Sequence, residues 1–185
     1  MIQVAQRTLE ELREGLDGVR EAPTDKGALE LIVRRPAEGE RELLDEAQID
    51  LELGVVGDLW PTRPGIKRRT PNPDAQVTVM SARAAALVAD GDDPKGWAQA
   101  GDQLYVDLDL SEANLPAGTR LEIGEAVLEV TADPHLGCGK FVRRFGRDAM
   151  KFVNSQEGRE LRLRGVNTRV IEPGTVRRGD AVRKV

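Results

Sequence analysis

The chain has 185 residues, of which 39% are hydrophobic and 32% are charged, and its formal net charge is -5. This length and composition are typical of one globular domain and exclude a largely disordered protein. A single cysteine excludes an intramolecular disulfide, and no apolar run approaches the roughly 20 residues that span a bilayer. The N-terminus has scattered acidic residues and no continuous apolar segment, unlike a signal peptide. We therefore expect a cytoplasmic protein.

The charge is unevenly distributed along the chain. Residues 1–138 hold 14 Lys and Arg against 27 Asp and Glu, whereas residues 139–185 hold 13 against 5. Such a basic segment can be no more than a solvated surface. It can also be a binding site for an anion, because clustered cations raise the local anion concentration. The sequence leaves both interpretations open.

The N-terminal half is predicted to begin with a helix. Leucines at three- and four-residue spacing predict an amphipathic helix over residues 4–16, with a weak capping box at Thr8 and Glu11 and an end at Gly15 or Gly18. Residues 1–25 are treated as an extension that precedes a domain of residues 26–185. The elements expected next are a strand over 28–34, a second strand or strand entry within 41–53, an exposed proline-rich loop over 60–73, a strand over 76–80, and a helix over 82–89 that Ser81 caps.

The C-terminal half is predicted to be mostly short strands. Its expected elements are an alternating strand over 104–110, two strands within 119–131 joined at Gly124-Glu125, a helix over 141–153, a helical turn over 159–163, and terminal strands over 166–171, 175–176 and 180–185. Many short strands with glycine turns and a few helices predict a mainly β, α+β fold. We expect a closed or nearly closed β-barrel with helical decoration.

The segment 134–140, PHLGCGK, holds the only cysteine and the only histidine, three positions apart. Glycine on both sides of Cys138 allows a tight turn and the close approach of a ligand. Cys138 also precedes a predicted helix that carries Lys140, Arg143, Arg144 and Arg147. Because a helix N-terminus and nearby cations both favour the thiolate, this arrangement predicts a lowered thiol pKa. The alternative is a buried packing cysteine that is chemically inert.

His135 has two interpretations. It is either a histidine of a simple turn or surface, or a proton relay or anion contact beside Cys138. We take His135 and Cys138 as candidate catalytic residues. They do not supply enough ligands for a zinc site on their own. A Cys-His-Asn nucleophile arrangement with Asn154 or Asn167 has the required residue types. However, a separation of three residues within one loop disfavours productive cysteine–histidine geometry.

From residue 54 onward the sequence resembles the MOSC family, named after the C-terminal domain of molybdenum-cofactor sulfurase. No single piece is specific; the order and spacing of the pieces carry the resemblance. Gln103 departs from the family pattern, where Asn is usual, and Gly-Cys-Gly stands where many members have Pro-Cys. The matching pieces are GVVGD at 54–58, QVTVM at 76–80, GDQL at 101–104, LPAGT at 115–119, LEIGEAVLEVT at 121–131, and Cys138 at the position of the family's invariant cysteine.

The resemblance implies a strand-rich fold like the pyruvate kinase β-barrel domain, with Cys138 at a pocket. There the cysteine would ligate molybdenum of the molybdenum cofactor (molybdopterin) or carry sulfur as a persulfide, and both roles suit a soft thiolate. The implied partners are a cysteine desulfurase (a pyridoxal phosphate-linked sulfurase), a molybdoenzyme, or a small anionic molecule. The cations and amides implied to hold the cofactor, its phosphate above all, are Lys140, Arg143, Arg144 and Arg147, followed by Arg164, Asn167 and Arg169.

Two other functions stay open on the sequence alone. One is a molybdenum-dependent reductase of small N- or S-oxygenated compounds. The other is a non-catalytic module that binds an anionic partner through its basic C-terminal surface. Nucleic acid is not expected to be that partner, because stacking aromatic residues are scarce and no nucleic-acid motif is present.

Overall fold

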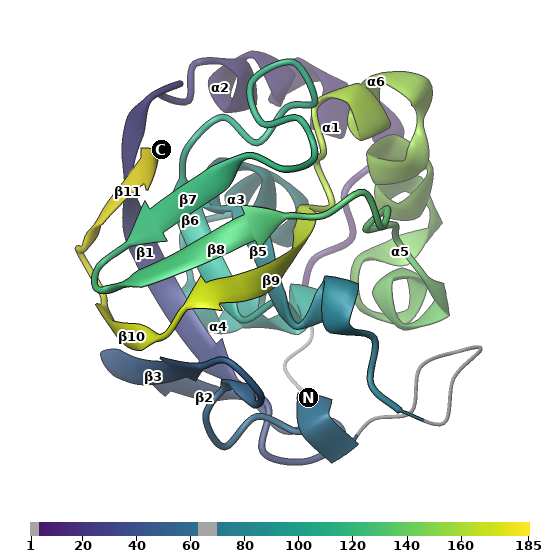
Figure 1. Ribbon diagram of the computed structural model, residues 1–185. Helices are drawn as coiled ribbons and strands as arrows, with labels where there is room; N and C mark the ends of the chain where they lie inside the picture. The colour runs from purple at the N-terminus through teal and green to yellow at the C-terminus, as the bar shows by residue number, and fades with distance from the viewer. Residues whose placement is uncertain (1–3, 63–69) are drawn as a thin grey trace.

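Seven strands close into a mixed β-barrel in the computed structural model, which describes residues 4–62 and 70–185 (Figure 1). The strand order is β11-β7-β8-β9-β5-β6-β1, and β1 pairs with β11 to complete the ring. All pairings are antiparallel except that of β5 with β6. The barrel strands are β1 (Lys26–Arg34), β5 (Val77–Ser81), β6 (Leu104–Asp107), β7 (Arg120–Ile123), β8 (Ala126–Val130), β9 (Val166–Glu172) and β11 (Ala181–Lys184).

Shorter strands extend this framework. The strand β2 (Glu42–Leu44) pairs with the second half of β1, beyond the part of β1 that contacts β11. A separate sheet has the order β10-β3-β4, and its buried side chains join the same hydrophobic cluster as the barrel interior. Its strands are β3 (Glu46–Asp50), β4 (Gly54–Val55) and β10 (Gly174–Arg177).

Helices cover the outside of the barrel, and α1, α5 and α6 gather on one side of it (Figure 1). The connection between β8 and β9 supplies α5 and α6, so the predicted Cys138 segment lies where the chain leaves the barrel. The helices are α1 (Leu9–Glu14), α2 (Leu16–Arg20), α3 (Ala82–Ala89), α4 (Pro94–Trp97), α5 (Gly139–Asn154) and α6 (Gln156–Glu160), with short 3-10 helices η1 (Trp60–Thr62), η2 (Pro73–Ala75) and η3 (Ala98–Ala100).

Alternating strand residues divide the hydrophobic core into two clusters. In β6, Leu104 and Val106 belong to the cluster that fills the barrel, whereas Tyr105 belongs to the cluster between the barrel and the helices. β5 shows the same division, with Val79 in the barrel cluster and Met80 in the helix-side cluster. Successive strand side chains point to opposite faces, and here both faces are covered, which explains why all three named residues of β6 are buried.

The predicted N-terminal helix is only partly correct. The capping box of Thr8 and Glu11 is confirmed, but it places the helix start at Leu9 rather than within residues 4–8. Gly15 ends α1, and Gly18 lies inside the separate helix α2. The expected helical turn at 159–163 is shifted to α6. The strand predicted over 76–80 and the helix predicted over 82–89 are found as β5 and α3, with bounds that differ by at most one residue. Of the proline-rich loop, residues 63–69 lie outside the described residues.

The helix predicted over 141–153 contains a break that its hydrophobic spacing does not reveal. Gly146 has φ 89° and ψ 173°, so α5 consists of two helical segments joined at this residue. A β-carbon at Gly146 would lie 2.9 Å from the side-chain oxygen of Gln6, because the N-terminal segment packs across the break. Glycine is therefore required here by backbone conformation, whereas the exposed side chain of Gln6 could move away from a β-carbon.

No helix in the described part of the chain is long and apolar enough to cross a membrane.

Candidate functional site

Cys138 is the N-cap residue of α5, and its side chain is exposed and lines a large cavity. The cavity has a volume of about 1110 Å³. Gly137 is buried, and a β-carbon on it would lie 2.7 Å from the sulfur of Met150, so its close approach to α5 explains one of the two flanking glycines. Asn154 fixes this loop by bonding both the N–H and the C=O of Gly137. The sulfur therefore projects from a loop tied firmly to the end of its own helix.

The pKa of the Cys138 thiol is lowered from its ordinary value by its surroundings. Partial burial raises this pKa, but the backbone N–H groups of Phe141 and Lys140 and the charges of Arg164 and Arg144 lower it. The backbone donors are the free N–H groups of the first helical turn, which favour an anion at the N-cap. The predicted thiolate is thus favoured by the helix terminus and by arginines rather than by the charge of Lys140.

His135 belongs to a buried ionic network beside the thiol. Its Nε2 lies 2.7 Å from Oδ1 of Asp102, whose carboxylate is sealed from solvent and also pairs with Arg164 through its second oxygen. Arg164 is itself buried, donates to the carbonyl of Ala100, and lies over the ring of Phe141. Such a network holds the imidazole in one orientation, because a buried carboxylate needs its full set of donors.

The electrostatics of this network make the neutral form of His135 the stable one. Burial lowers the pKa of His135, and the charge of Arg164 lowers it further against the opposing effect of Asp102. For Asp102, burial raises the pKa, but Arg164 and His135 outweigh it and hold the carboxyl ionised. Because the carboxylate accepts, Nε2 carries the proton and donates, and Nδ1 is left with a lone pair. His135 lines the cavity and can therefore act as a hydrogen-bond acceptor there.

Among the described residues, six cationic side chains line the cavity, and three of them are paired with carboxylates. Arg35 binds Asp58, Arg164 binds Asp102, and Lys140 binds Glu38 at 2.6 Å. Within residues 4–62 and 70–185, no carboxylate lies within ion-pair distance of the remaining three. Those three are Arg41, Arg143 and Arg144.

Arg41 and Arg144 converge over Gly101. A terminal guanidinium nitrogen of each lies 3.3 Å from the point where a β-carbon on Gly101 would sit. Carbonyls of the neighbouring turn hold both side chains in place: Ala98 accepts from Arg41 at 3.1 Å, and Gln99 accepts from Arg144 at 2.6 Å. Burial, followed by the charges of Arg144 and Arg35, lowers the pKa of Arg41 to about 10. Two half-buried cations held together in this way repel each other, and an anion bound between them would offset that repulsion.

Polar side chains line the cavity as well as cations. Asp133 accepts hydrogen bonds from the side-chain amides of Asn72 and Asn167. Asp74 and Thr78 also line the cavity. The lining therefore offers amide, hydroxyl and carboxylate groups in addition to the arginines.

The predicted site residues fall into two groups. Those that line the cavity are Cys138, His135, Lys140, Arg143, Arg144, Arg164 and Asn167. Arg147 and Arg169 are not among the lining residues of the described chain, and Arg169 instead pairs with Glu129 at 2.5 Å. The structure pairs His135 with Asp102, and the carboxamides of Asn154 and Asn167 bond Gly137 and Asp133 instead.

Sequence reasoning missed Asp102 as the partner of His135, and it missed Arg35 and Arg41 altogether. Arg35 and Arg41 flank the connection from β1 to β2, about one hundred residues before α5. Only the barrel topology brings this connection to the cysteine. Asp102 lies within the GDQL stretch at 101–104, and no local pattern there revealed that its carboxylate is buried.

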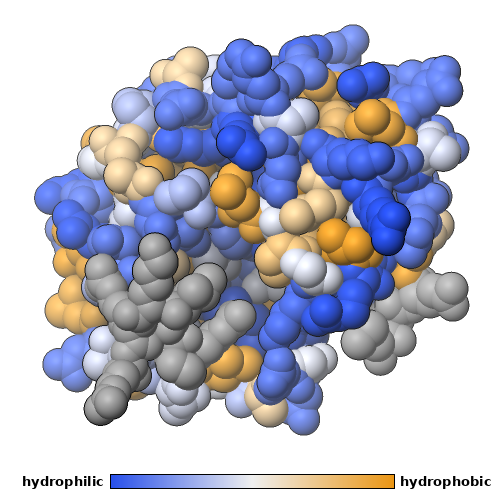
Figure 2. Space-filling model, turned by 90° about the vertical axis from the view of Figure 1, so that its right-hand side faces the viewer, coloured by the Kyte–Doolittle hydropathy of each residue, from blue (hydrophilic) through white to orange (hydrophobic). Residues whose placement is uncertain are grey.

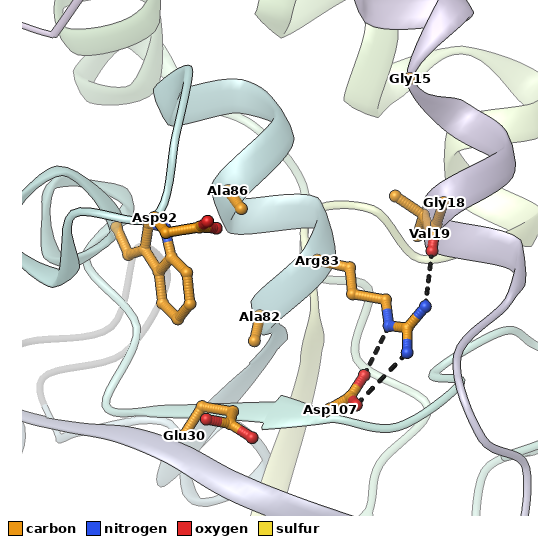
Figure 3. Close-up of a pocket in the computed structure, with 10 residues that line it drawn as sticks. Gly15, Gly18, Val19, Glu30, Ala82, Arg83, Ala86, Asp92 and Asp107 are labelled. Carbon is orange, nitrogen blue, oxygen red and sulfur yellow. Dashed lines mark hydrogen bonds and ion pairs between the residues drawn. The ribbon is translucent and has the colours of Figure 1, made fainter.

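The face that carries α5 is mostly hydrophilic, with small hydrophobic patches between charged side chains (Figure 2). A second, smaller pocket of about 350 Å³ lies elsewhere, between α2 and α3. In it, Arg83 reaches from α3 to Asp107 and to the carbonyl of Gly18 (Figure 3). These polar groups satisfy one another, and no cysteine or histidine is among the lining residues. The Cys138 cavity is therefore the candidate functional site.

Comparisons with known proteins identify a family and a fold. The family model described as "MOSC domain" matches residues 67–183. The fold is similar to the crystal structure of the YuaD protein of Bacillus subtilis, with 20% identity, 85% of this chain and 94% of that chain covered, and a TM-score of 0.58. It is also similar to YiiM of Escherichia coli, with 21% identity, 85% and 69% covered, and a TM-score of 0.56. YiiM of Geobacillus stearothermophilus is similar too, with 14% identity, 89% of this chain and 74% of that chain covered, and a TM-score of 0.53. No curated protein matches the chain.

Proposed function

Because the chain belongs to the MOSC domain family, whose members are associated with the molybdenum cofactor, we propose that Cys138 is its working thiolate and carries sulfur as a persulfide. The observation that carries this proposal is an exposed thiol with a lowered pKa at the wall of a large, cation-lined cavity. A thiolate is the form that attacks a sulfur donor. The resulting persulfide is an anion as well, so the same donors that favour the thiolate favour it.

The residues around Cys138 have defined parts in this chemistry. The backbone N–H groups of Phe141 and Lys140 and the charge of Arg144 favour the negative sulfur. His135 keeps a lone pair on Nδ1, because its Nε2–H donates a hydrogen bond to Asp102, so Nδ1 can accept a hydrogen bond from an incoming group. Arg164 also lowers the pKa of the Cys138 thiol, and it holds Asp102 ionised.

The direct test is mass spectrometry of the intact protein after incubation with a cysteine desulfurase and cysteine. We expect a gain of about 32 Da that a thiol reductant removes and that is absent from Cys138→Ala. A matched control is iodoacetamide labelling of the same sample, which measures whether the thiol was available. A protein that iodoacetamide labels fully but that never gains sulfur from the desulfurase contradicts the proposal.

The same cavity also supports the molybdenum cofactor itself as a ligand. The fit rests on the donor set: a soft thiolate for molybdenum, Arg41, Arg143 and Arg144 for the phosphate, and a volume of about 1110 Å³. The described residues contain no group of three or more His, Cys, Asp or Glu that could hold a metal ion, so a metal at Cys138 requires further ligands of its own, as the cofactor's dithiolene provides. When bound, the cofactor supplies molybdenum redox chemistry.

This second candidate extends to a reductase of small N- or S-oxygenated compounds, and it has its own measurement. Freshly purified protein, denatured and oxidised, is expected to release pterin fluorescence if it binds the cofactor. The phosphate contact predicts that Arg144→Gln loses more of this signal than Arg147→Gln, which removes the same charge outside the cavity. Equal loss of the signal from the two variants contradicts cofactor binding at these residues. The absence of pterin from the unaltered protein contradicts it as well.

A further inference from the structure

The pairing of Arg41 and Arg144 needs an explanation that the fold does not supply. Both guanidiniums approach the same point above Gly101, and neither has a carboxylate within ion-pair distance in the described chain. Mutually repelling cations that are half buried persist in a fold when something else holds or uses them. Here the carbonyls of Ala98 and Gln99 fix their positions, but carbonyls do not neutralise their charge.

The space between these arginines suits a small oxyanion. Guanidinium groups bind the flat, multiple oxygen edges of phosphate- and sulfate-like anions with two parallel hydrogen bonds. Gly101 contributes by having no side chain, since a β-carbon would lie 3.3 Å from each arginine. Nearby, the Nε of Arg164 has no hydrogen-bond partner among the described residues, but this atom is buried and has almost no surface that a ligand could contact.

This anion site and the thiol share one cavity. Arg144 lies on α5, six residues after Cys138, and the two groups interact electrostatically, each charge favouring the other. Cys138, Arg41 and Arg144 all line the cavity. An oxyanion bound by the arginines would therefore occupy the same cavity as the nucleophilic sulfur.

From this juxtaposition we propose that the protein takes its sulfur directly from a small anionic sulfane-sulfur donor of the thiosulfate type, whose sulfonate end binds Arg41 and Arg144. The inference rests on the proposed persulfide function of Cys138 and adds the chemical class of the donor. The Cys138 thiolate attacks the outer sulfur of thiosulfate and forms a new S–S bond. The original S–S bond breaks, its electron pair leaves with sulfite, and the protein retains a persulfide. No proton, oxidant or reductant is needed.

The arginines are required because this reaction brings a thiolate together with a dianion. Without cations the two reactants repel each other, and the leaving sulfite carries the same double charge as the donor. Fixed guanidiniums neutralise that charge in the bound donor and in the departing sulfite. They therefore lower the barrier to the attack of the thiolate on thiosulfate and to the departure of sulfite. A neutral sulfur donor would gain nothing from them.

The experiment uses the full-length protein and thiosulfate labelled with a heavy isotope in its outer sulfur. We expect the label to appear on Cys138 as a reducible adduct, with one equivalent of sulfite released, and neither product from Cys138→Ala. Arg144→Gln and Arg41→Gln are each expected to raise the half-saturating thiosulfate concentration by about tenfold, the effect typical of losing a charge-assisted hydrogen bond.

Arg147→Gln is the matched control, because it removes the same charge from the same helix outside the cavity. Each rate is divided by the iodoacetamide labelling rate of that variant, which corrects for changes in thiol ionisation. Equal effects of Arg147→Gln and Arg144→Gln would overturn the local site in favour of bulk charge. If Arg41→Gln fails to fold, protection of Cys138 by sulfate in the unaltered protein gives an independent test. Sulfate should slow the labelling of Cys138 by anionic iodoacetate more than its labelling by neutral iodoacetamide. Equal slowing of the two reactions contradicts the site.

Failure of this inference can be told apart from failure of the proposed function. A protein that a cysteine desulfurase loads with sulfur, but that thiosulfate does not load at any concentration, is a persulfide carrier with a different donor. A protein that neither donor loads, despite an accessible thiol, loses both proposals together.

Discussion

Nε2 of His135 lies 2.7 Å from Oδ1 of Asp102, and that carboxylate has no exposed surface at all. Arg164 occupies its second oxygen, so a single buried anion serves two donors from distant segments of the chain. The contact fixes the tautomer of His135 and ties the loop before α5 to the turn that precedes β6. Structure around the thiol and stability of the whole molecule therefore depend on the same group.

We first predict that the protein loses stability as the pH falls from about 7 toward 5. The folded state lowers the pKa of His135, chiefly through burial, so the unfolded chain binds a proton there more readily. Stability from this group is complete above the ordinary histidine pKa of about 6.5 and decreases as the pH falls through the lower folded value. Urea unfolding at a series of pH values measures it. Because His135 is the only histidine, His135→Gln should flatten the profile in this range, and an unchanged slope contradicts the assignment.

A second prediction concerns Asp102→Asn. The substitution leaves Arg164 buried without its counter-charge, and breaking a buried pair in this way typically costs about 3–5 kcal/mol. We expect that loss in the free energy of unfolding from denaturant titration. Asp107→Asn is the control, because its pair with Arg83 is about one-third exposed and should cost only about 0–1 kcal/mol. Comparable losses from the two variants would show that Asp102 is not a buried charge partner.

Third, the rate at which iodoacetamide labels Cys138 should rise with pH to a midpoint below the ordinary cysteine pKa. The backbone N–H groups of the first turn of α5 and the charges of Arg164 and Arg144 outweigh partial burial, so the thiolate forms at lower pH. Arg144→Gln should move the midpoint upward. Arg147→Gln should move it less, because Arg147 lies outside the cavity. A midpoint at or above the ordinary value would contradict the thiolate.

Fourth, Gly146→Ala should destabilise the protein by about 1–3 kcal/mol, the cost of forcing a side chain into a backbone conformation that is essentially restricted to glycine. The β-carbon would also crowd the side chain of Gln6. Gly18→Ala is the matched control: Gly18 lies inside α2 with open space around it, and alanine there should be neutral or stabilising by up to about 1 kcal/mol. Thermal unfolding of the two variants compares them directly. Equal effects would mean that the break in α5 is not enforced at Gly146.

Local patterns were enough to predict most of the elements. The strands on either side of Gly124 were visible because apolar residues alternate and a glycine turn separates them, and these interactions span only a few residues. The break at Gly146 was not visible, since Phe145, Ala149 and Phe152 keep helical spacing across it. A single backbone conformation changed the helix without changing its hydrophobic pattern.

The candidate site was predicted only where its residues are neighbours in sequence. Cys138, His135 and Arg144 could be grouped because one loop and one helix carry them. Arg41 and Asp102 come from other connections of the barrel, and their place beside the cysteine follows from strand order, which no local pattern encodes. The density of positive charge in the C-terminal segment led to too many cations being assigned to the site. Arg169 of that segment pairs with Glu129 instead.

The closure of the barrel by β1 and β11 has a consequence for synthesis of the protein. Lys26 pairs with Arg183, so the ring is complete only after nearly the entire described sequence has been translated. Until then β1 presents an unpaired edge, and the contacts that seal it are among the most distant in the chain, which slows folding and favours association between nascent chains. Assistance from a chaperone would matter most in the interval before the last strand emerges from the ribosome.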